Sequence, residues 1–558
     1  MIEALLAGLL GLFLFYLLLG FFILNPLHVS WLLEPNNQDT VQHFIGWEFF
    51  RHESWHFPLG LILQYGAPLG TSIVYTDSVP LFALLFKCFQ SDLPAHFQYF
   101  GIWFACCFFL QGFFACLISH EISQNFYIKL LITSFFLLSP IMLNRLIEHQ
   151  ALSAHWVILA ALWLYIKPYT KKSNPCWLVL NVITILIHAY LSFLILFIWI
   201  AFIIKNKFIR GVMSSTSFLL QVGCYFFCIS ILAWLAGYFI FYSSQSVKAG
   251  GFIFNAMNLL APIFPTSGSE VLSSNWSLFL HPLGHLLTRQ GDEGFNYFGM
   301  GELFLIIFSL LYCFKNKCWM SKEKFKEYLP LLLVCFFFFL FSLSNKIYVG
   351  QYNIINYSFP NHFEAFSEVF RNPGRFFWPA YYLIMIAAFF VVSRLPKKRS
   401  ICLLSVALLL QLLDLSPKLR ELVHYFHHPS PLIYPMTDPF WGMAEKKYTT
   451  LAFLPITEAP QLEVRYFQDY LYYAATHNMK VNNGYFARYD KVRLWKLRQQ
   501  LSRQMYQGQF DSHTLYVIID PSLISIIRAK SPPYSKIIHL LGYYVLAPNW
   551  FSSASIKS

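Results

Sequence analysis

Long apolar runs, separated by polar segments, dominate the first 415 residues of the chain. The runs cover residues 4–24, 97–118, 127–143, 151–166, 176–204, 217–242, 302–314, 329–343, 377–393 and 400–413. A helix needs roughly 20 apolar residues to cross the hydrocarbon core of a membrane, and several runs reach that length. The pattern therefore predicts an α-helical polytopic membrane domain over residues 1–415.

Two segments decide how many helices cross the membrane. Residues 78–89 form a short apolar stretch that contains Pro80 and Lys87, so this stretch is predicted to be re-entrant or interfacial. Residues 176–204 are too many for one upright helix, and lysines flank them on both sides. We therefore predict a hairpin of two short helices that turns near His188, which gives about 11 transmembrane helices.

Lysine and arginine gather in the short segments on one side of this arrangement. The segments on this side are 119–126, 167–175, 205–216, 315–328 and 394–399, and all but the first carry lysine or arginine. The long loops on the other side, 25–96, 243–301 and 344–376, hold few basic residues for their length. The positive-inside rule then places the N-terminus in the cytoplasm and the long loops outside. Basic residues facing an anionic inner leaflet account for part of the net charge of +13, so no nucleic-acid partner is expected.

The pattern changes after residue 413 to that of a water-soluble domain. Strand-like runs at 449–454 and 515–519 alternate with helix-like stretches at 466–477 and 491–507. This alternation predicts a C-terminal α/β domain over residues 416–558, which an odd number of spans places outside the cytoplasm. Asn483 and Gly484 are predicted to form a turn in it.

Two classes of feature are excluded by the cysteines and the first apolar run. The 11 cysteines lie mostly within apolar runs and form no CxxC pair, which argues against a disulfide framework or a zinc site. The run over residues 4–24 has no basic segment before it and no small-residue cleavage site after it. It is therefore expected to be a retained span and not a signal peptide.

The first long loop concentrates the groups that can carry chemistry. Only 12% of the residues of the chain are charged, yet Asp39, Glu48, Arg51 and Asp77 lie within about 40 positions, among histidines and tryptophans. Asp39 is the candidate catalytic base, and the other three are candidate substrate contacts. Structural alternatives are an N-cap for Asp39, an i, i+3 pair of Glu48 with Arg51, and a turn or cap for Asp77.

Three other external segments carry polar groups that a lipid-facing helix would not tolerate. The candidate substrate-binding residues there are Glu148, His149, Asp292, Glu293, Arg371 and Arg375. The arginines open an apolar run, where they could bind a lipid phosphate or only anchor the helix at the headgroups. Asp292 and Glu293 lie between glycines, which leaves a solvated turn as their alternative.

Carboxylates in an external loop together with arginines near the bilayer suit glycosyl transfer from a polyprenyl-phosphate-linked sugar. An inverting transfer needs one carboxylate to take the proton of the acceptor hydroxyl, a role we assign to Asp39. Cationic groups stabilise the charge on the departing phosphate, a role we assign to Arg371 and Arg375. Phosphate leaves readily as an anion, so the second acid of a glycosidase is not required.

At these residues the chain resembles the GT-C superfamily of polytopic membrane glycosyltransferases. The segments 38–87, 148–152, 292–301 and 370–378 resemble an uncharacterised bacterial branch of it. The resemblance implies a GT-C-like fold and a catalytic carboxylate at Asp39. It further implies a location in the bacterial inner membrane and a polyprenyl-phosphate-linked sugar donor among the membrane lipids. The acceptor it implies is an extracytoplasmic glycan, lipid or protein of the cell envelope.

Neither the residues of the chain nor the resemblance decides whether the protein binds a divalent metal. Several metal-dependent members of the superfamily have Asp-x-Asp at the early loop, whereas this chain has Asn37, Gln38 and Asp39. His43, His52 and His56 offer another set of ligands, although interfacial histidines among tryptophans are common without a metal.

Two other functions compete with transfer. A secondary transporter would also be polytopic, but it would place ionisable groups and broken helices near the bilayer midplane and often show internal repeats. The acids of this chain cluster outside the apolar runs, and no repeat is evident. A non-catalytic scaffold of envelope polysaccharide assembly is the other alternative, and it predicts that Asp39 is dispensable.

Overall fold

The computed structural model of the chain describes residues 1–34, 37–241, 251–265, 275–280, 292–317, 320–358, 360, 367, 369–429, 434–457 and 466–551. The chain divides into two compact units, each assembled from stretches that lie far apart in the sequence. The first unit comprises residues 1–28, 99–232 and 249–429, and the second comprises residues 29–98, 233–248 and 430–558. The expected domains 1–415 and 416–558 stay predictions.

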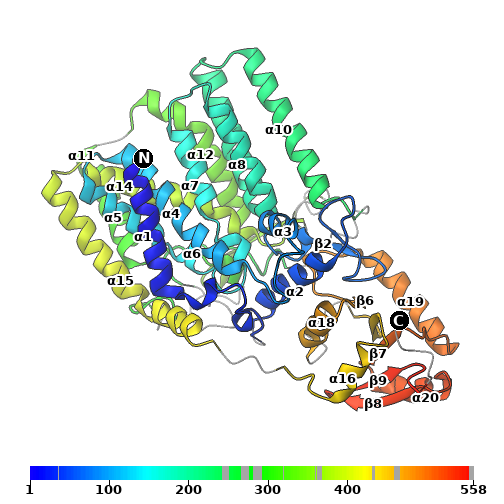
Figure 1. Ribbon diagram of the computed structural model, residues 1–558. Helices are drawn as coiled ribbons and strands as arrows, with labels where there is room; N and C mark the ends of the chain where they lie inside the picture. The colour runs from blue at the N-terminus through cyan, green and yellow to red at the C-terminus, as the bar shows by residue number, and fades with distance from the viewer. Residues whose placement is uncertain are drawn as a thin grey trace. The chain divides into compact units, whose positions relative to one another are not determined.

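The first unit is a bundle of apolar helices (Figure 1). Its main helices are α1 (Ile2–Leu19), α4 (Phe100–Ile122), α5 (Phe126–Leu137), α6 (Pro140–Leu143), α7 (Trp156–Ile166), α8 (Ser173–Ile187), α9 (Ala189–Ile204), α10 (Ser215–Ala236, whose last residues belong to the second unit), α11 (Met300–Asn316), α12 (Lys322–Ser342), α14 (Trp378–Ser393) and α15 (Lys397–His427). Within the described residues, 8 helical segments are long and apolar enough to cross a membrane, and two shorter apolar ones accompany them. The chain is therefore a multi-pass membrane protein, and the number of helices is roughly as predicted.

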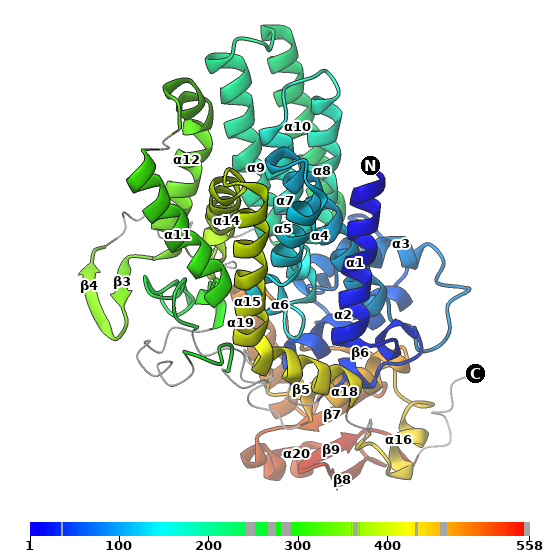
Figure 2. The same cartoon turned by 90° about the vertical axis from the view of Figure 1, so that its left-hand side faces the viewer.

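The predicted break near His188 is present. His188 has an extended backbone, with φ −164° and ψ 137°, and this ends α8 and begins α9. The His188 side chain accepts a hydrogen bond from the backbone N–H of Tyr190, so it caps α9. The two short helices pack against each other, and they lie side by side in Figure 2.

Small residues let α1 and α4 pack closely. A Cβ atom on Gly11 would lie 2.1 Å from the carbonyl oxygen of Phe108, and one on Gly112 would lie 2.2 Å from that of Ala7. Close backbone approach at small residues replaces the hydrophobic effect, which supplies no attraction between helices surrounded by lipid. Substituting either glycine would push the two helices apart.

A buried carboxylate holds the segment before α11. Asp414 of α15 accepts hydrogen bonds from the Tyr297 hydroxyl at 2.7 Å, from the backbone N–H of Met300 at 3.0 Å, and from Ser277. Because Met300 is the first residue of α11, its N–H has no partner within the helix, and Asp414 supplies one. This contact fixes the path of the loop that carries Glu293.

The second unit contains a five-stranded mixed sheet. Its strands are β5 (Thr450–Leu454), β6 (Lys480–Val481), β7 (Thr514–Ile518), β8 (Lys536–Leu540) and β9 (Tyr543–Ala547), in the order β6-β5-β7-β9-β8. Strand β5 is parallel to β6 and β7, whereas β9 is antiparallel to β7 and β8. With helices α16 (Pro439–Ala444), α18 (Phe467–Thr476), α19 (Lys491–Tyr506) and α20 (Ile524–Lys530), it confirms the predicted C-terminal α/β fold.

Successive side chains of β5 point to opposite faces of this sheet. Ala452 and Leu454 pack with Met505 of α19 and Ile527 of α20. Phe453 packs instead against α18, with its ring 5.1 Å from that of Phe467. Apolar side chains on both faces explain why β5 and β7 are apolar after their first residue, as expected for central parallel strands.

The first long loop belongs to the same compact unit as this sheet. Its main helix, α2 (Gln38–His52), packs against α18, where the rings of Phe44 and Tyr472 lie 6.1 Å apart. The Tyr472 hydroxyl contacts Nδ1 of His96 at 3.1 Å. Helix α3 (Pro80–Lys87) is too short to cross a membrane, as predicted for residues 78–89.

Candidate functional site

Asp39 lies in the first turn of α2, and it is not the N-cap. The cap is Asn37, whose side-chain oxygen accepts a hydrogen bond from the backbone N–H of Thr40 at 3.2 Å. Asp39 is half-buried, and its Oδ1 accepts a hydrogen bond from the Tyr485 hydroxyl at 2.7 Å. The N-cap alternative for Asp39 is therefore wrong.

Tyr485 is positioned by the loop that follows β6. Its backbone N–H donates to the hydroxyl of Tyr65 at 3.4 Å. Tyr65 is fully buried and stacks on Phe49 of α2, with ring centroids 4.5 Å apart. The hydroxyl that contacts Asp39 is therefore held by a stack of aromatic rings.

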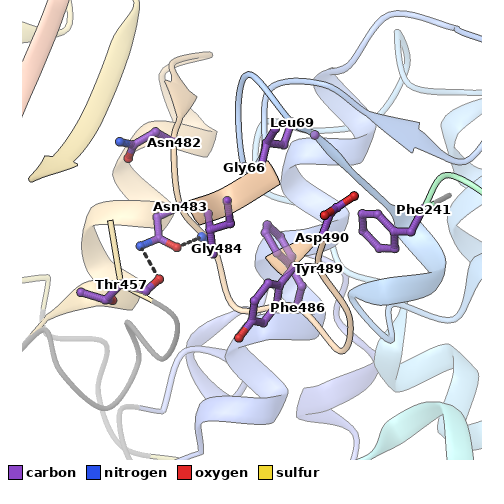
Figure 3. A pocket seen from close by; sticks show the side chains of 12 residues that line it. Gly66, Leu69, Phe241, Thr457, Asn482, Asn483, Gly484, Phe486, Tyr489 and Asp490 are labelled. Carbon is purple, nitrogen blue, oxygen red and sulfur yellow. Dashed lines mark hydrogen bonds between the residues drawn. The ribbon is translucent and has the colours of Figure 1, made fainter. Parts of the chain in front are cut away.

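The same loop lines a pocket of about 400 Å³, open space at its mouth included (Figure 3). Its lining includes the rings of Phe241, Phe486 and Tyr489 and the carboxylate of Asp490. Asn483, expected in a turn, holds the wall by donating to the carbonyl oxygen of Thr457 at 3.3 Å. Gly484 and Phe486 flank Tyr485 in the sequence, so the pocket adjoins the Asp39 contact.

Asp77 lies close to another group of α2. Its carboxylate and a ring nitrogen of His43 lie within 4.8 Å of each other, a spacing at which one cation could contact both. Gly46 allows this approach, because a Cβ atom there would lie 2.4 Å from Cβ of Thr76. Ser78 Oγ donates to the carbonyl oxygen of His43 at 2.6 Å and fixes the register of the two segments.

Glu48 and Arg51 are buried together, as the i, i+3 alternative predicts. Arg51 donates to Glu48 at 3.4 Å, but its shorter bond is to the carbonyl oxygen of Pro94, at 2.6 Å. Burial raises the pKa of Glu48 to about 8, although the guanidinium opposes the shift. Glu48 is therefore largely neutral at pH 7, and the contacts of Arg51 favour a role in holding the loop.

The other two histidines of this loop are engaged locally. Nδ1 of His52 contacts the carbonyl oxygen of Glu48 at 2.9 Å, one turn earlier in α2. His56 pairs with Glu53 at 3.3 Å. The second oxygen of Glu53 accepts from the backbone N–H groups of Leu63 and Gln64. Within the described part of the chain, these two histidines do not gather with His43 around a common point.

A second cluster, in the first unit, surrounds Glu293. Its carboxylate contacts Arg145 at 2.9 Å, His149 at 2.7 Å, and Nε of Arg375 at 2.6 Å, and the Nη2 atom of Arg375 adds another bond. The guanidinium groups lie over rings, Arg145 over Trp378 and Arg375 over Tyr190. Three segments far apart in sequence therefore meet at one carboxylate.

The ionisation of Glu293 and of Arg145 is set by burial and by the charged groups around them. Burial by itself raises the pKa of Glu293, but Arg145, Arg375 and His149 together hold it well below its usual range. Burial also disfavours the charged form of the Arg145 guanidinium and so lowers its pKa. Nε of Arg145 is buried and has no hydrogen-bond partner among the described residues. The two guanidinium groups and His149 face the Glu293 carboxylate, and the carboxylate of Glu148 also acts on Arg145.

The remaining predicted residues of this unit are Arg371, Glu148 and Asp292. The side chain of Arg371 is half-buried and makes no hydrogen bond or ion pair with any residue that the structure describes. Glu148 is close enough to raise the pKa of Arg145. The backbone of Asp292 lies in the short helix η8 (Asp292–Gly294), and its side chain lies outside the described residues.

An apolar groove of about 1820 Å³, open space at its mouth included, runs along the same unit. Side chains of α11, α12 and α14 line it, and every lining residue is apolar. Phe377, one of them, ends the short helix η9 (Pro373–Phe377), which also carries Arg375. The groove and the cationic cluster are therefore joined through one short element.

Comparison with known proteins identifies a family. Residues 8–416 match the family described as "Domain of unknown function (DUF6311)", and residues 440–548 match "DUF6311 C-terminal domain". The chain belongs to the DUF6311 family. No curated protein matches it.

One solved structure similar to this DUF6311 protein is the archaeal oligosaccharyltransferase AglB from Archaeoglobus fulgidus, in complex with an inhibitory peptide and a dolichol-phosphate. The two chains are 11% identical and superpose with a TM-score of 0.45, over 98% of this chain and 74% of that one. The likeness is slight.

Sequence reasoning missed Arg145 and Tyr485, two residues of the candidate site in this DUF6311 protein. Arg145 begins a short polar segment in which Glu148 and His149 are the clearer candidates, so the sequence does not single it out. Tyr485 lies in a tail of mixed composition, and only its place after the run Asn482, Asn483 and Gly484 marked it as part of a loop. The pairing of Tyr485 with Asp39 depends on a contact across 446 positions.

Proposed function

We propose that this chain is a membrane glycosyltransferase that moves a sugar from a polyprenyl-phosphate donor to an extracytoplasmic acceptor with inversion. The observation that carries the proposal is that the short helix η9 joins an apolar groove to the buried cluster of Arg145, Arg375 and Glu293. An isoprenoid tail needs a long apolar surface, and its phosphate needs positive charge at one end of that surface.

The chemistry follows from the groups available. The Asp39 carboxylate takes the proton of an acceptor hydroxyl, whose oxygen attacks the anomeric carbon of the donor sugar. The bond from that carbon to the phosphate oxygen breaks, and the polyprenyl phosphate leaves with the bonding electrons. Arg371 meets the departing phosphate, while Arg145 and Arg375 supply fixed positive charge from the cluster.

The other predicted residues have supporting roles in this proposal. Asp77 contacts the sugars, or a divalent cation shared with His43, whose ring lies within reach. Glu148, His149 and Asp292 contact the donor sugar in this proposal, and Glu293 holds Arg145 and Arg375. Glu48 and Arg51 fix the loop that carries Asp39.

The proposal includes a topology. The N-terminus lies in the cytoplasm, and the loops and the C-terminal domain lie outside the bacterial inner membrane. The acceptor is then a cell-envelope glycan, lipid or protein.

The test compares lipid-linked glycans from cells that carry the wild-type chain or Asp39→Asn at matched expression. We expect the variant to accumulate a polyprenyl-phosphate sugar and to lose one glycan product. Asp520→Asn is the matched control, because Asp520 caps a short helix on the surface and Asn caps equally well. Identical profiles for wild type and Asp39→Asn would contradict the proposal and favour transport or scaffolding.

A further inference from the structure

Helix α3 turns its charge inward and its apolar residues outward. Its sequence contains one charged residue, Lys87, which is 1% exposed. Leu85 is 53% exposed, and Phe89, in the turn that follows the helix, is 54% exposed. A helix on a water-facing surface has the opposite arrangement, with its charges in solvent and its apolar stripe against the core. The arrangement of α3 suits a helix whose outer side does not face water.

Aromatic rings hold the Lys87 ammonium on the inner side of α3. Its Nζ lies 3.9 Å from the centre of the Phe50 ring and 4.6 Å from that of Trp55. It has no hydrogen-bond partner among the described residues. Burial lowers the pKa of Lys87 to about 8, although the nearby carboxylate of Glu53 opposes the shift. A lysine beside water would extend its long side chain into it, so the inward path indicates an outer environment that disfavours a cation.

The outer side of α3 is a continuous apolar stripe. Leu81, Leu85 and Phe89 follow one another at intervals of four residues, which places them on one side of the helix. Cys88 is exposed next to Phe89. Exposed polar residues return only over residues 90–92, after the helix has ended.

The segment after α2 adds two exposed rings to this stripe. Trp55, whose ring contacts the Lys87 ammonium, is 43% exposed, and Phe57 is 73% exposed. His52 and Ser54, also exposed, provide polar groups near Trp55. Tryptophan and polar groups together are typical of the layer between hydrocarbon and water.

Phe57 connects these residues to a helix that can cross the membrane. Its ring stacks on that of Trp234, with centroids 6.5 Å apart, and Trp234 lies in the last turn of the candidate span α10. The backbone N–H of Gly60 donates to the carbonyl oxygen of Leu235 at 3.1 Å. A Cβ atom on Gly60 would lie 2.1 Å from the carbonyl oxygen of Ala236. The segment that carries Phe57 therefore packs directly on the end of a span.

We propose that Trp55, Phe57, Leu85 and Phe89 form a lipid-binding surface, the α3 surface, which inserts among the acyl chains at the edge of the membrane. The charge of Lys87 stays on the inner side, so no cation enters the hydrocarbon. The α3 surface fastens to the bilayer the compact unit that contains α2 and the five-stranded sheet. The inference does not depend on the proposed glycosyl transfer.

A second protein is the competing occupant, and the α3 surface suits it less. A protein interface surrounds its apolar centre with polar groups that pair across it. The stripe of α3 offers no amide or charged side chain before Gln90. Phe57 also lies at the end of a span, where lipid is always present.

The experiment detects contact between these side chains and lipid by photo-crosslinking. The full chain is made with p-benzoylphenylalanine in place of Phe57, Leu85 or Phe89 and placed in dioleoylphosphatidylcholine nanodiscs. Illumination couples the ketone carbon to a C–H carbon of a neighbouring acyl chain, and mass spectrometry of the protein detects the added lipid. Leu220, which is exposed on the span α10, is the positive control position. Tyr506, which is exposed between the exposed residues Arg503 and Gln507, is the negative one.

We expect lipid adducts at Phe57, Leu85 and Phe89 in yields similar to that at Leu220 and about tenfold above that at Tyr506. Adducts at Leu220 without adducts at the three test positions would overturn the proposal, as would equal yields at Leu85 and Tyr506. Covalent dimers of the chain at these positions would make a second copy the occupant, and the lipid assignment would then be wrong.

A second variant tests whether α3 and Phe57 act together. Leu85→Asp/Phe89→Asp puts two carboxylates on the stripe, and charged groups resist transfer into hydrocarbon. The adduct at Phe57 should fall several-fold in this variant, whereas that at Leu220 should not change. Val492→Asp/Tyr506→Asp is the matched control, because it places the same charges at exposed apolar positions of α19. An undiminished adduct at Phe57 would show that α3 is not part of the lipid-binding surface.

Discussion

The Tyr485 hydroxyl donates a hydrogen bond to Oδ1 of Asp39 at 2.7 Å, across 446 positions of the sequence. The bond holds the carboxylate that we propose as the catalytic base, and it joins the first long loop to the loop after β6. A base must present its oxygen to the acceptor hydroxyl within hydrogen-bond reach, so its orientation matters as much as its charge.

Tyr485→Phe should lower the rate of transfer without abolishing it. The substitution keeps the ring between Gly484 and Phe486 and removes only the bond to Asp39. A hydrogen bond of this kind contributes about 1 kcal/mol, which corresponds to about a fivefold loss of rate. The measurement is the initial rate of glycan product formed by purified protein with membrane-extracted donor.

Tyr448→Phe is the control for this change. Its hydroxyl donates to the carbonyl oxygen of Pro548 at 2.7 Å, also within the second unit but in the sheet domain and not in the loop that contacts Asp39. Equal losses in the two variants would show that the effect is one of stability, and the positioning role of Tyr485 would then be wrong.

Glu48 should make the stability of the chain fall as the pH rises. Its folded pKa is raised to about 8 by burial, so the folded protein holds a proton that the unfolded chain releases near pH 4.5. The contribution is complete below the unfolded pKa and is lost as the pH rises through about 8, by at most about 1.4 kcal/mol per pH unit.

Thermal unfolding in detergent between pH 5 and pH 9 measures this dependence, with Glu48→Gln as the comparison. The amide cannot ionise, so the variant should lose the downward trend and exceed the wild type at high pH. A wild-type midpoint that is flat or rises over the same range would mean that Glu48 is ionised in the fold.

Arg371 and Arg375 should differ in role: Arg371 contacts the donor, and Arg375 stabilises the fold. Arg375→Gln breaks a buried pair with Glu293 and is expected to cost about 3 kcal/mol of stability. Arg371 has no partner among the described residues, so Arg371→Gln should leave stability within about 0.5 kcal/mol and raise the KM for the donor. Unfolding midpoints and donor titrations of both variants check this, and equal stability losses would refute the division.

A larger side chain in the apolar groove should weaken binding of the donor. Ile307 lines the groove and is 56% exposed, so Ile307→Trp fills space without disturbing the core. We expect the KM for the donor to rise several-fold with kcat little changed, as for a loss of uniform binding. Leu220→Trp on α10, which is 63% exposed at wild type and outside the groove, is the control. A KM that rises equally in both would exclude the groove as the tail site.

Local patterns predicted most of the elements. The strand-like run at 449–454 became β5 and that at 515–519 became β7, each within one residue at either end, and the stretch at 491–507 became α19. The break at His188 followed from the length of the apolar run and the lysines around it. Strands β6, β8 and β9 were missed. β6 is only two residues long and β8 is half-exposed, so neither of these two has a clear pattern.

The candidate site was found in part. Asp39, Glu293 and Arg375 stood out because charge is rare in this chain, and the structure gives each a specific partner. Arg145 and Tyr485 could not be chosen from sequence, since nothing local distinguishes them from other arginines and tyrosines. Capping shows the same limit, because Asn37 and Asp39 are both good caps and only the backbone path selects Asn37.

The sequence by itself determined that this is a multi-pass membrane protein with a C-terminal α/β domain, because apolar run length and strand alternation are local properties that solvent and lipid enforce directly. Tertiary structure decided which polar groups meet. Glu293 gathers two arginines and a histidine from distant segments, and Asp39 meets Tyr485, because buried charge and buried hydroxyls must find partners wherever the packing of the helices and the sheet provides them.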